Sequence, residues 1–185
     1  MRKIDTIILH CTATPRGRDY SVDTIRGWHK TRGWDDIGYH YIIHLDGTIS
    51  EGRPVERVGA HAKNYNANSI GIAYVGGLDE SAKKSVDTRT PEQDKAFKTL
   101  IAKLIEEHKD IRVLIGHRDT SPDLNGNGTV ERGEWIKDCP CFEVEESYGI
   151  WFRNLLIMKH KNKIVDEIYD AYTRLADKRK RSAGF

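Results

Sequence analysis

The sequence lacks any apolar run long enough to cross a membrane. No run approaches the ~18 residues of a membrane-spanning helix. Charged residues interrupt the first ten positions, which excludes the apolar core of a secretory signal peptide. We therefore expect no transmembrane segment, no signal peptide and synthesis in the cytoplasm.

An excess of charge of one sign is also missing. The 30 Lys and Arg against 28 Asp and Glu give a net charge of +2, too little to indicate a nucleic-acid partner. The charge is unevenly spread, because residues 151–185 hold nine basic and four acidic side chains, a net +5. The last 35 residues therefore form a basic tail that differs in kind from residues 1–150.

Cysteine is scarce as well. Cys11, Cys139 and Cys141 are odd in number and badly spaced for a disulfide framework, so metal ligation or burial is the better interpretation. With 38% hydrophobic and 31% charged residues in 185 positions, the chain fits one ordinary globular domain, or one such domain with an appendage.

Strand and helix signals alternate along the chain, which predicts an α/β domain. The expected strands cover residues 4–9, 39–44, 48–50, 69–75 and 111–115. The expected helices cover residues 21–32 and 90–108, the second begun by a capping box at Thr90. An irregular segment spans residues 118–143. A C-terminal amphipathic helix carries an apolar stripe of Ile164, Ile168, Tyr172 and Leu175.

Two histidines occupy positions suited to chemistry. His10 and His117 each follow a predicted strand, where a sheet can fix a side chain beside a cleft. With Cys139 they make a recognised zinc set, whose three protein ligands leave the fourth position open to water. Spacing alone leaves a plain structural role open, with two capped strand ends and a buried thiol.

The remaining cysteine and histidine candidates favour structural roles. Adjacent strand residues point to opposite faces, so Cys11 should lie in the core, away from His10. His40 and His44 should pack within their strand. His29, His108 and His160 lie among charged residues and should be solvated.

Ordered motifs then resemble a known family. They are Ile8-Leu9-His10-Cys11-Thr12, Gly33-Trp34-Asp35-Asp36-Ile37-Gly38-Tyr39-His40, Gly59-Ala60-His61-Ala62-Lys63, Asn68-Ser69-Ile70-Gly71, Gly116-His117-Arg118-Asp119 and Lys137-Asp138-Cys139-Pro140. Together they resemble the type 2 N-acetylmuramoyl-L-alanine amidases, the zinc enzymes related to the peptidoglycan recognition proteins. The resemblance covers roughly residues 3–143 and implies a mixed central β-sheet flanked by helices.

The resemblance also implies site roles. His10, His117 and Cys139 match the zinc ligands, and Tyr39 and Lys137 match the catalytic pair. The implied substrate is peptidoglycan, cut between N-acetylmuramic acid and L-alanine, as in the endolysins of phages and prophages. Zinc would lower the pKa of its bound water to ~7, while Lys137 and Tyr39 would donate to the tetrahedral oxyanion.

Other residues of these motifs receive weaker assignments. His61 and Trp34 are implied substrate contacts, and Asn68 is more a structural residue that holds its loop. Arg118 and Asp119 could orient a ligand imidazole, and a surface ion pair explains them equally well.

Residues 123–134 lie in a segment between His117 and Cys139 where this sequence departs from the compact phage members of the family that it resembles. Asp123, Asn125, Asn127, Thr129 and Glu134, with Gly128 at the sixth position, match the calcium-loop pattern. Obvious flanking helices are missing, so an ion-free Asn-Gly turn remains an equal alternative.

Two rival functions remain at this point. A binding module of the same fold would recognise muropeptides without cutting them, but it could dispense with Cys139. A cysteine hydrolase using Cys11 or Cys139 would be insensitive to chelators. The basic tail is expected to pack on the domain or to contact anionic wall polymers by a screened attraction.

Overall fold

The structure is a computed structural model that describes residues 2–159 and 161. The chain divides into two compact units, Met1–Gly149 and Ile150–Phe185. In the second unit residues 150–159 are helical, which confirms a C-terminal helix, whereas the predicted stripe at residues 164–175 lies outside the described residues. Within the described part of the chain, no helix combines the length and apolar character that a membrane crossing requires.

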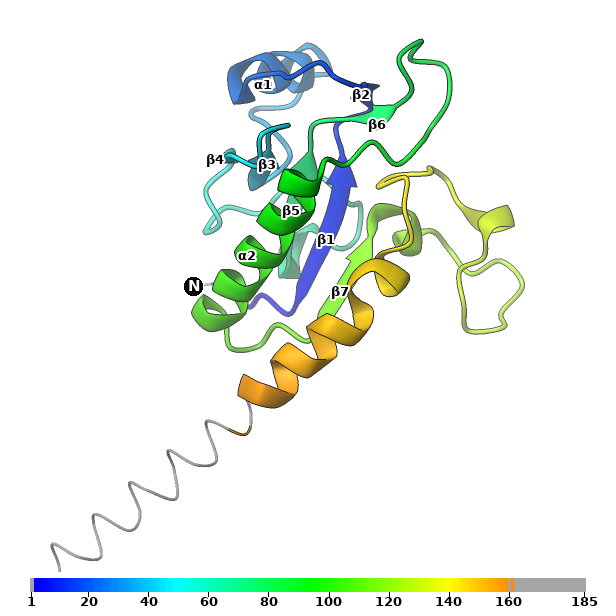
Figure 1. The fold of residues 1–185 in the computed structure, drawn as a ribbon. Helices are drawn as coiled ribbons and strands as arrows, with labels where there is room; N and C mark the ends of the chain where they lie inside the picture. Colours follow the sequence, from blue (N-terminus) through cyan, green and yellow to red (C-terminus); the bar gives the residue numbers. More distant parts are fainter. Residues whose placement is uncertain (1, 160, 162–185) are drawn as a thin grey trace, which may run out of the picture. The chain divides into compact units, whose positions relative to one another are not determined.

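A five-stranded mixed sheet forms the centre of the first unit, in the order β4-β3-β5-β1-β7 (Figure 1). Its strands are β1 (Thr6–Cys11), β3 (Tyr41–Ile43), β4 (Ile49–Glu51), β5 (Ser69–Tyr74) and β7 (Val113–Gly116). Only β4 runs antiparallel to its neighbour. A second, two-stranded sheet pairs β2 (Thr14–Pro15) with β6 (Gly77–Leu78). The predicted mixed α/β architecture is confirmed.

Both predicted helices of the first unit form where their caps indicate. Helix α1 (Val22–Thr31) begins after Ser21, whose side chain accepts from the Thr24 N–H. Helix α2 (Pro91–Glu107) begins with the capping box of Thr90 and Gln93, each side chain accepting from the other's backbone N–H. Gln93 is fully buried, and its amide donates to the carbonyls of Ile43 and Val75, which ties the helix start to the sheet.

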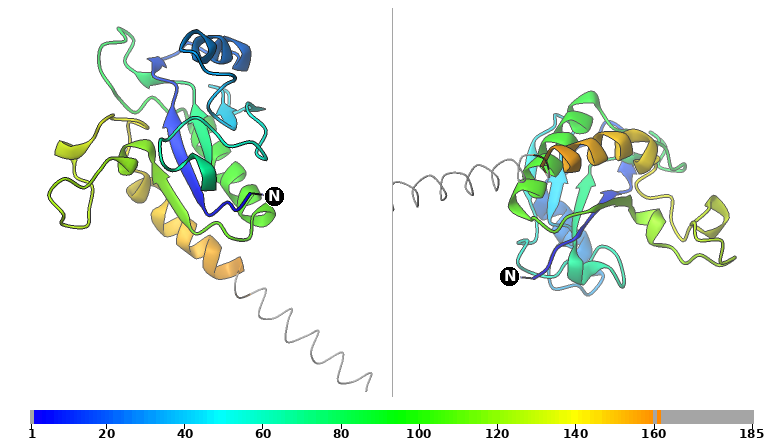
Figure 2. Two further views of the ribbon diagram at one scale, coloured as in Figure 1. Left: turned by 180° about the vertical axis from the view of Figure 1, so that it is seen from behind. Right: turned by 90° about the horizontal axis from the view of Figure 1, so that it is seen from below.

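Helix α2 covers one face of the sheet (Figures 1 and 2). Its buried stripe comprises Ala96, Phe97, Leu100, Ile101, Leu104 and Ile105. The Phe97 ring lies 6.1 Å from that of Tyr74 on β5 and 6.3 Å from that of Phe142. Side chains alternate along a strand, so the residues next to Tyr74 on β5 point to the opposite face of the sheet, the one that α2 does not cover.

A smaller core lies under α1 and corrects one prediction. Ile25 of the helix packs with Ile37 and Ile42. His29, expected to be solvated, is buried instead, because its Nδ1 accepts from the Gly38 N–H at 2.9 Å and Trp34 packs on its ring at 4.7 Å. Its charged sequence neighbours Lys30 and Arg32 are exposed, so their charge gave no information about the environment of His29.

Gly71 on β5 makes room for an imidazole on that second face. A Cβ at position 71 would come within 2.5 Å of His61 Cγ, and one at Gly59 would come equally close to the same ring. The missing side chains let His61 lie flat on the strand beside His40, whose ring is 5.5 Å away.

We predict that Gly71→Ala lowers the free energy of unfolding by about 1–3 kcal/mol, because the buried His61 ring has to move. Gly27→Ala is the matched control, since an added Cβ on this exposed turn of α1 meets nothing within 4 Å. It should stabilise the helix by roughly 0.5–1 kcal/mol. Urea unfolding measures both, and equal effects would contradict the packing argument.

Candidate active site

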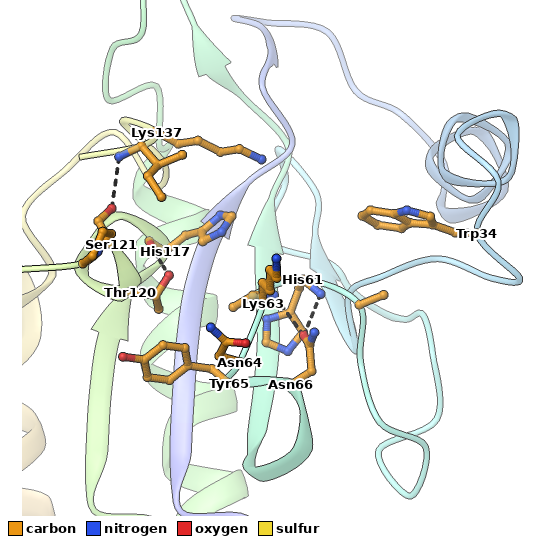
Figure 3. Close-up of a pocket in the computed structure, with 14 residues that line it drawn as sticks. Trp34, His61, Lys63, Asn64, Tyr65, Asn66, His117, Thr120, Ser121 and Lys137 are labelled. Carbon is orange, nitrogen blue, oxygen red and sulfur yellow. Dashed lines mark hydrogen bonds between the residues drawn. The ribbon is translucent and has the colours of Figure 1, made fainter. Parts of the chain in front are cut away.

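The carboxyl edge of the sheet opens into a cavity of 990 Å³ (Figure 3). Trp34 and Lys137 lie on opposite sides of this cavity, and His61 and His117 lie between them. The remaining lining side chains include Lys63, Asn64, Tyr65, Asn66, Thr120, Ser121 and Ile136. We call this cavity the groove. One side of the groove carries the exposed Trp34 ring and the other carries the exposed Lys137 side chain.

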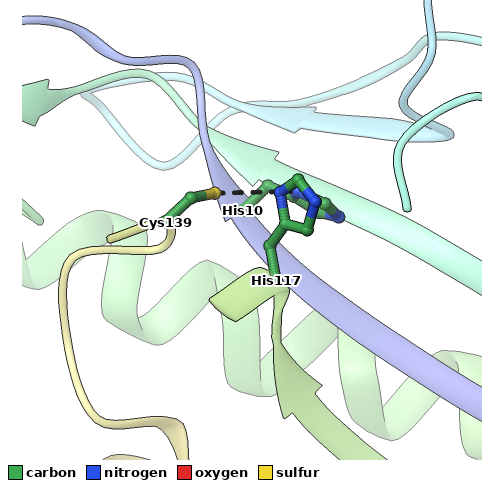
Figure 4. A group of neighbouring side chains, drawn as sticks. All are labelled: His10, His117 and Cys139. Atoms are coloured by element: carbon green, nitrogen blue, oxygen red, sulfur yellow. Dashed lines mark hydrogen bonds between the residues drawn. The ribbon is translucent and has the colours of Figure 1, made fainter. Parts of the chain in front are cut away.

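Three side chains converge at the edge of the sheet (Figure 4). His10 lies near the end of β1, His117 follows β7 directly, and Cys139 ends the irregular segment. Parallel neighbours end at the same edge of a sheet, which brings the two histidines together. One ligand atom from each residue lies within 4.8 Å of the others. Among the described residues, this is the group of His, Cys, Asp and Glu side chains that could hold a metal ion.

The donor set fits zinc. The Cys139 Sγ lies 3.7 Å from His10 Nδ1, and ligand atoms of a tetrahedral zinc lie roughly 3.3–3.6 Å apart at ordinary bond lengths. The backbone N–H of Cys11 donates to the same sulfur at 3.3 Å. Such a bond stabilises the thiolate form that a metal requires.

Both imidazoles are neutral near pH 7. Burial, followed by the neighbouring His61, His117 and Lys137 charges, holds the pKa of His10 well below its ordinary value. Burial, with a smaller effect of Lys137, lowers the pKa of His117 to about 4. Neutral imidazoles keep a lone pair free, and metal coordination needs that lone pair.

Several contacts fix the end of the irregular segment. The Cys139 carbonyl accepts from the Arg118 N–H at 2.7 Å, and the Tyr74 hydroxyl donates to the Pro140 carbonyl at 3.0 Å. Cys141 lies apart from the histidines, with its Sγ 3.6 Å from Cys11 Sγ and donating to the Gly77 carbonyl. Cys11 is buried, as predicted.

Arg118 and Asp119 support the turn after β7. The Asp119 carboxylate accepts from the Gly116 N–H at 2.7 Å and so caps the turn that carries His117. The Arg118 guanidinium is buried, 4.0 Å above the Trp135 ring and 2.7 Å from a carboxylate oxygen of Glu143. Arg118 is thus paired with Glu143 and buried rather than at the surface, whereas Asp119 supports the backbone turn that precedes His117.

The two predicted catalytic side chains lie near different histidines of the cluster. The Tyr39 ring lies 5.1 Å from the His10 ring, and burial, with the Cys139 sulfur nearby, raises the pKa of its phenol. Lys137 is exposed and lines the groove beside His117. A protonated phenol and an ammonium at this site can both donate to an anionic oxygen.

The predicted substrate contacts differ from one another in exposure. Trp34 is 38% exposed at one wall of the groove. His61 lines the groove but is buried, and its Nδ1 lies 3.0 Å from His10 Nε2.

The side chain that holds the His61 loop is Asn66. Its Oδ1 accepts from the N–H groups of His61 and Ala62, each at 2.9 Å. Asn68 is exposed and joins the sheet through its backbone, accepting from the Asp5 N–H. A loop-holding asparagine was expected in this region, but the role was assigned to Asn68. The sequence pattern did not show that Asn66 is the residue that makes the contact.

The calcium-like segment forms an exposed loop closed by its own hydrogen bonds. Asp123 accepts from the N–H groups of Gly126 and Gly128, and Asn125 accepts from that of Asn127. Asn127 accepts from the N–H and hydroxyl of Thr129. Glu134 accepts from Leu124, Asn125 and Glu131. The oxygen-bearing side chains therefore turn into the loop.

Comparison with known proteins supplies the class. The family model described as N-acetylmuramoyl-L-alanine amidase matches residues 1–133. The endolysin of Escherichia phage T7 is 37% identical over 153 residues, 83% of this chain and 89% of its own length. The endolysin of Klebsiella phage KP32 is 36% identical over 151 residues, 82% of this chain and 87% of its own.

Solved structures agree with these relatives. The amidase LysC from Clostridium intestinale URNW has 31% identity and a TM-score of 0.61, covering 81% of this chain and 86% of its own. Bumblebee PGRP-SA has 27% identity and a TM-score of 0.62, covering 82% and 83%. The chain belongs to the N-acetylmuramoyl-L-alanine amidase family, and it is an enzyme of that class. Lys137 and Cys139 lie beyond the residues 1–133 that the family model matches.

We predict that Asn66→Ala destabilises the fold by about 1–3 kcal/mol, because it leaves two backbone N–H groups without an acceptor. Asn68→Ala, two positions along the same loop, removes an exposed amide and should change stability by less than about 0.5 kcal/mol. Thermal unfolding of both variants checks this. A larger loss in the Asn68 variant would refute the assignment of the loop contact.

Proposed function

We propose that this enzyme cuts the amide bond between N-acetylmuramic acid and L-alanine in peptidoglycan, with zinc held by His10, His117 and Cys139. The observation that carries the proposal is the convergence of these three ligand atoms within 4.8 Å at the edge of the groove. Two imidazoles and a thiolate satisfy zinc and leave one position for a reacting group. The relatives named endolysin support action on the bacterial wall.

The groove suits an extended substrate. Its volume of 990 Å³ lies at the upper end of the roughly 300–1,000 Å³ typical of ligand pockets. Trp34 at one side offers an apolar face to a sugar or an acyl group. Lys63, which also lines the groove, offers a cation to a carboxylate of the stem peptide. Peptide and sugar would then lie on either side of the scissile bond.

In the proposed hydrolysis, the zinc ion and the side chains of Tyr39 and Lys137 have different roles. Bound zinc supplies a Lewis acid and a nucleophile at neutral pH. The Tyr39 phenol, kept protonated by its raised pKa, donates a hydrogen bond to the carbonyl oxygen as negative charge develops there. The Lys137 ammonium stabilises the same charge from the open side of the groove. As the tetrahedral state collapses, the C–N bond breaks and the proton lost by the attacking water passes to the departing amine.

We predict that Cys139→Ala loses bound zinc and amide hydrolysis together, because it removes one of three protein ligands. Cys141→Ser is the matched control, since its hydroxyl can keep the hydrogen bond that Cys141 donates to Gly77. Metal analysis and release of stem peptide from purified peptidoglycan measure the two properties, with and without a chelator.

Two further variants separate metal binding from catalysis in that experiment. Tyr39→Phe and Lys137→Ala keep all three ligands, so they should keep zinc while turnover falls on the order of 10²-fold or more. Equal zinc loss in the Cys139 and Cys141 variants, or hydrolysis that survives full metal removal, would overturn the proposal. A cysteine hydrolase would show that second result.

Calcium binding by residues 123–134 remains a separate proposal from the sequence pattern. Asp123 and Glu134 would turn their carboxylates from backbone N–H groups to the ion, which limits the affinity to about 10⁻⁴–10⁻³ M. Ordering this loop would steady the segment that leads to Lys137 and Cys139. The basic tail, whose residues 162–185 are outside the described part of the chain, is proposed to contact anionic wall polymers or the domain.

We predict that calcium at ten times its Kd stabilises the protein by about 1.4 kcal/mol, visible as a rise in Tm that magnesium does not match. Asp123→Ala should abolish the rise. Asp110→Asn removes one exposed carboxylate outside the loop and should retain it. A Tm indifferent to calcium in the wild type would eliminate the calcium site.

A further inference from the structure

The two ring nitrogens of His10 face different partners. Nδ1 lies 3.7 Å from Cys139 Sγ, on the side where the ligand atoms converge. Nε2 lies 3.0 Å from His61 Nδ1, within the buried layer over β5. The His10 ring is completely buried, so water does not compete for either nitrogen. Whatever holds the proton on Nε2 therefore decides whether Nδ1 is free.

Hydrogen-bond chemistry fixes that proton through Ser69. The Ser69 hydroxyl donates its one proton to the Tyr65 carbonyl at 2.7 Å, because a carbonyl can only accept. Its oxygen is then left to accept from His61 Nε2, which lies 3.4 Å away. His61 accordingly carries its proton on Nε2 and presents a bare Nδ1 to His10.

The same reasoning extends to the next ring. Because His61 Nδ1 is an acceptor, His10 Nε2 has to be the donor across the 3.0 Å contact. Neutral His10 then has an unprotonated Nδ1 directed at the Cys139 sulfur. The order of donors runs from His10 to His61 to Ser69 to the Tyr65 backbone.

We infer that His61 is a positioning residue, which sets the tautomer and the ring orientation of His10 so that Nδ1 binds the metal. This role rests on the proposed zinc site and differs from the substrate contact that the sequence implied for His61. The orienting ring is itself fixed, since Gly71 and Gly59 approach one side and the His40 ring packs edge-on at 5.5 Å. A hydrogen-bond partner behind a ligating imidazole commonly raises metal affinity 10–100-fold.

Three substitutions at position 61 separate the hydrogen bond from the packing. His61→Asn places its Oδ1 where Nδ1 was, so it keeps the acceptor for His10. His61→Gln directs its amide farther out, toward Ser69, and His61→Leu has no acceptor. Zinc Kd is measured for the full chain by competition with a chelator. We expect Leu and Gln to raise Kd 10–100-fold and Asn to remain within about threefold of wild type.

Thermal unfolding of the zinc-free variants distinguishes positioning from packing. If His61 only fills space, Kd follows the loss of stability and Asn gives no rescue. Equal zinc Kd in wild type and the Leu variant overturns the inference. So does a rescue by Gln rather than Asn, because Gln cannot reach His10 Nε2.

A second test uses the wild-type protein, so its result does not depend on whether a variant folds. Long-range proton–nitrogen NMR of the histidine rings assigns the protonated nitrogen in the metal-free and zinc-loaded chain. We expect a proton on His10 Nε2 in both states and a metal-induced shift at Nδ1 alone. A proton on Nδ1 of the metal-free His10 refutes the inference even if the chain never binds zinc, and absence of zinc binding alone refutes the proposed function instead.

Discussion

The parallel pairing of β1 with β7 is the constraint on which the site depends. It aligns Leu9 with Gly116, although 106 residues lie between them in the sequence. The next residues, His10 and His117, therefore lie at the same edge of the sheet. A change of register by one residue would turn His10 to the face covered by α2. The buried apolar residues of both faces therefore hold the two histidines in place, because they fix the register.

The long irregular segment is anchored in the core at its far end. Phe142 packs against Phe97 and Tyr148, and the Arg89 guanidinium lies 3.4 Å above the Phe142 ring. Together with the bond from Tyr74 to Pro140, these contacts fix the chain directly after Cys139. The loop can thus vary in length between residues 121 and 136 without moving Cys139, and the exposed calcium-like turn occupies that stretch.

Structural features that depend on a few consecutive residues could be predicted from the sequence. The capping box at Thr90 lies within four residues and formed as expected. The zinc set needed the family resemblance, because spacing along the chain does not reveal which strands are neighbours. His29 and Asn66 were misjudged or missed for the same reason: their hydrogen-bond partners, Gly38 for one and the His61 loop for the other, depend on how the chain folds back.

The amide of Cys11 that donates to the Cys139 sulfur belongs to the main chain. A hydrogen bond withdraws electron density from a ligating thiolate, so the sulfur donates less to a metal and leaves it more electrophilic. Under the proposed zinc chemistry, part of the reactivity is thereby encoded in the backbone. Substitution of the Cys11 side chain leaves this donor in place, except by proline. Sequence drift at position 11 can consequently alter the core while preserving the electronic character of the site.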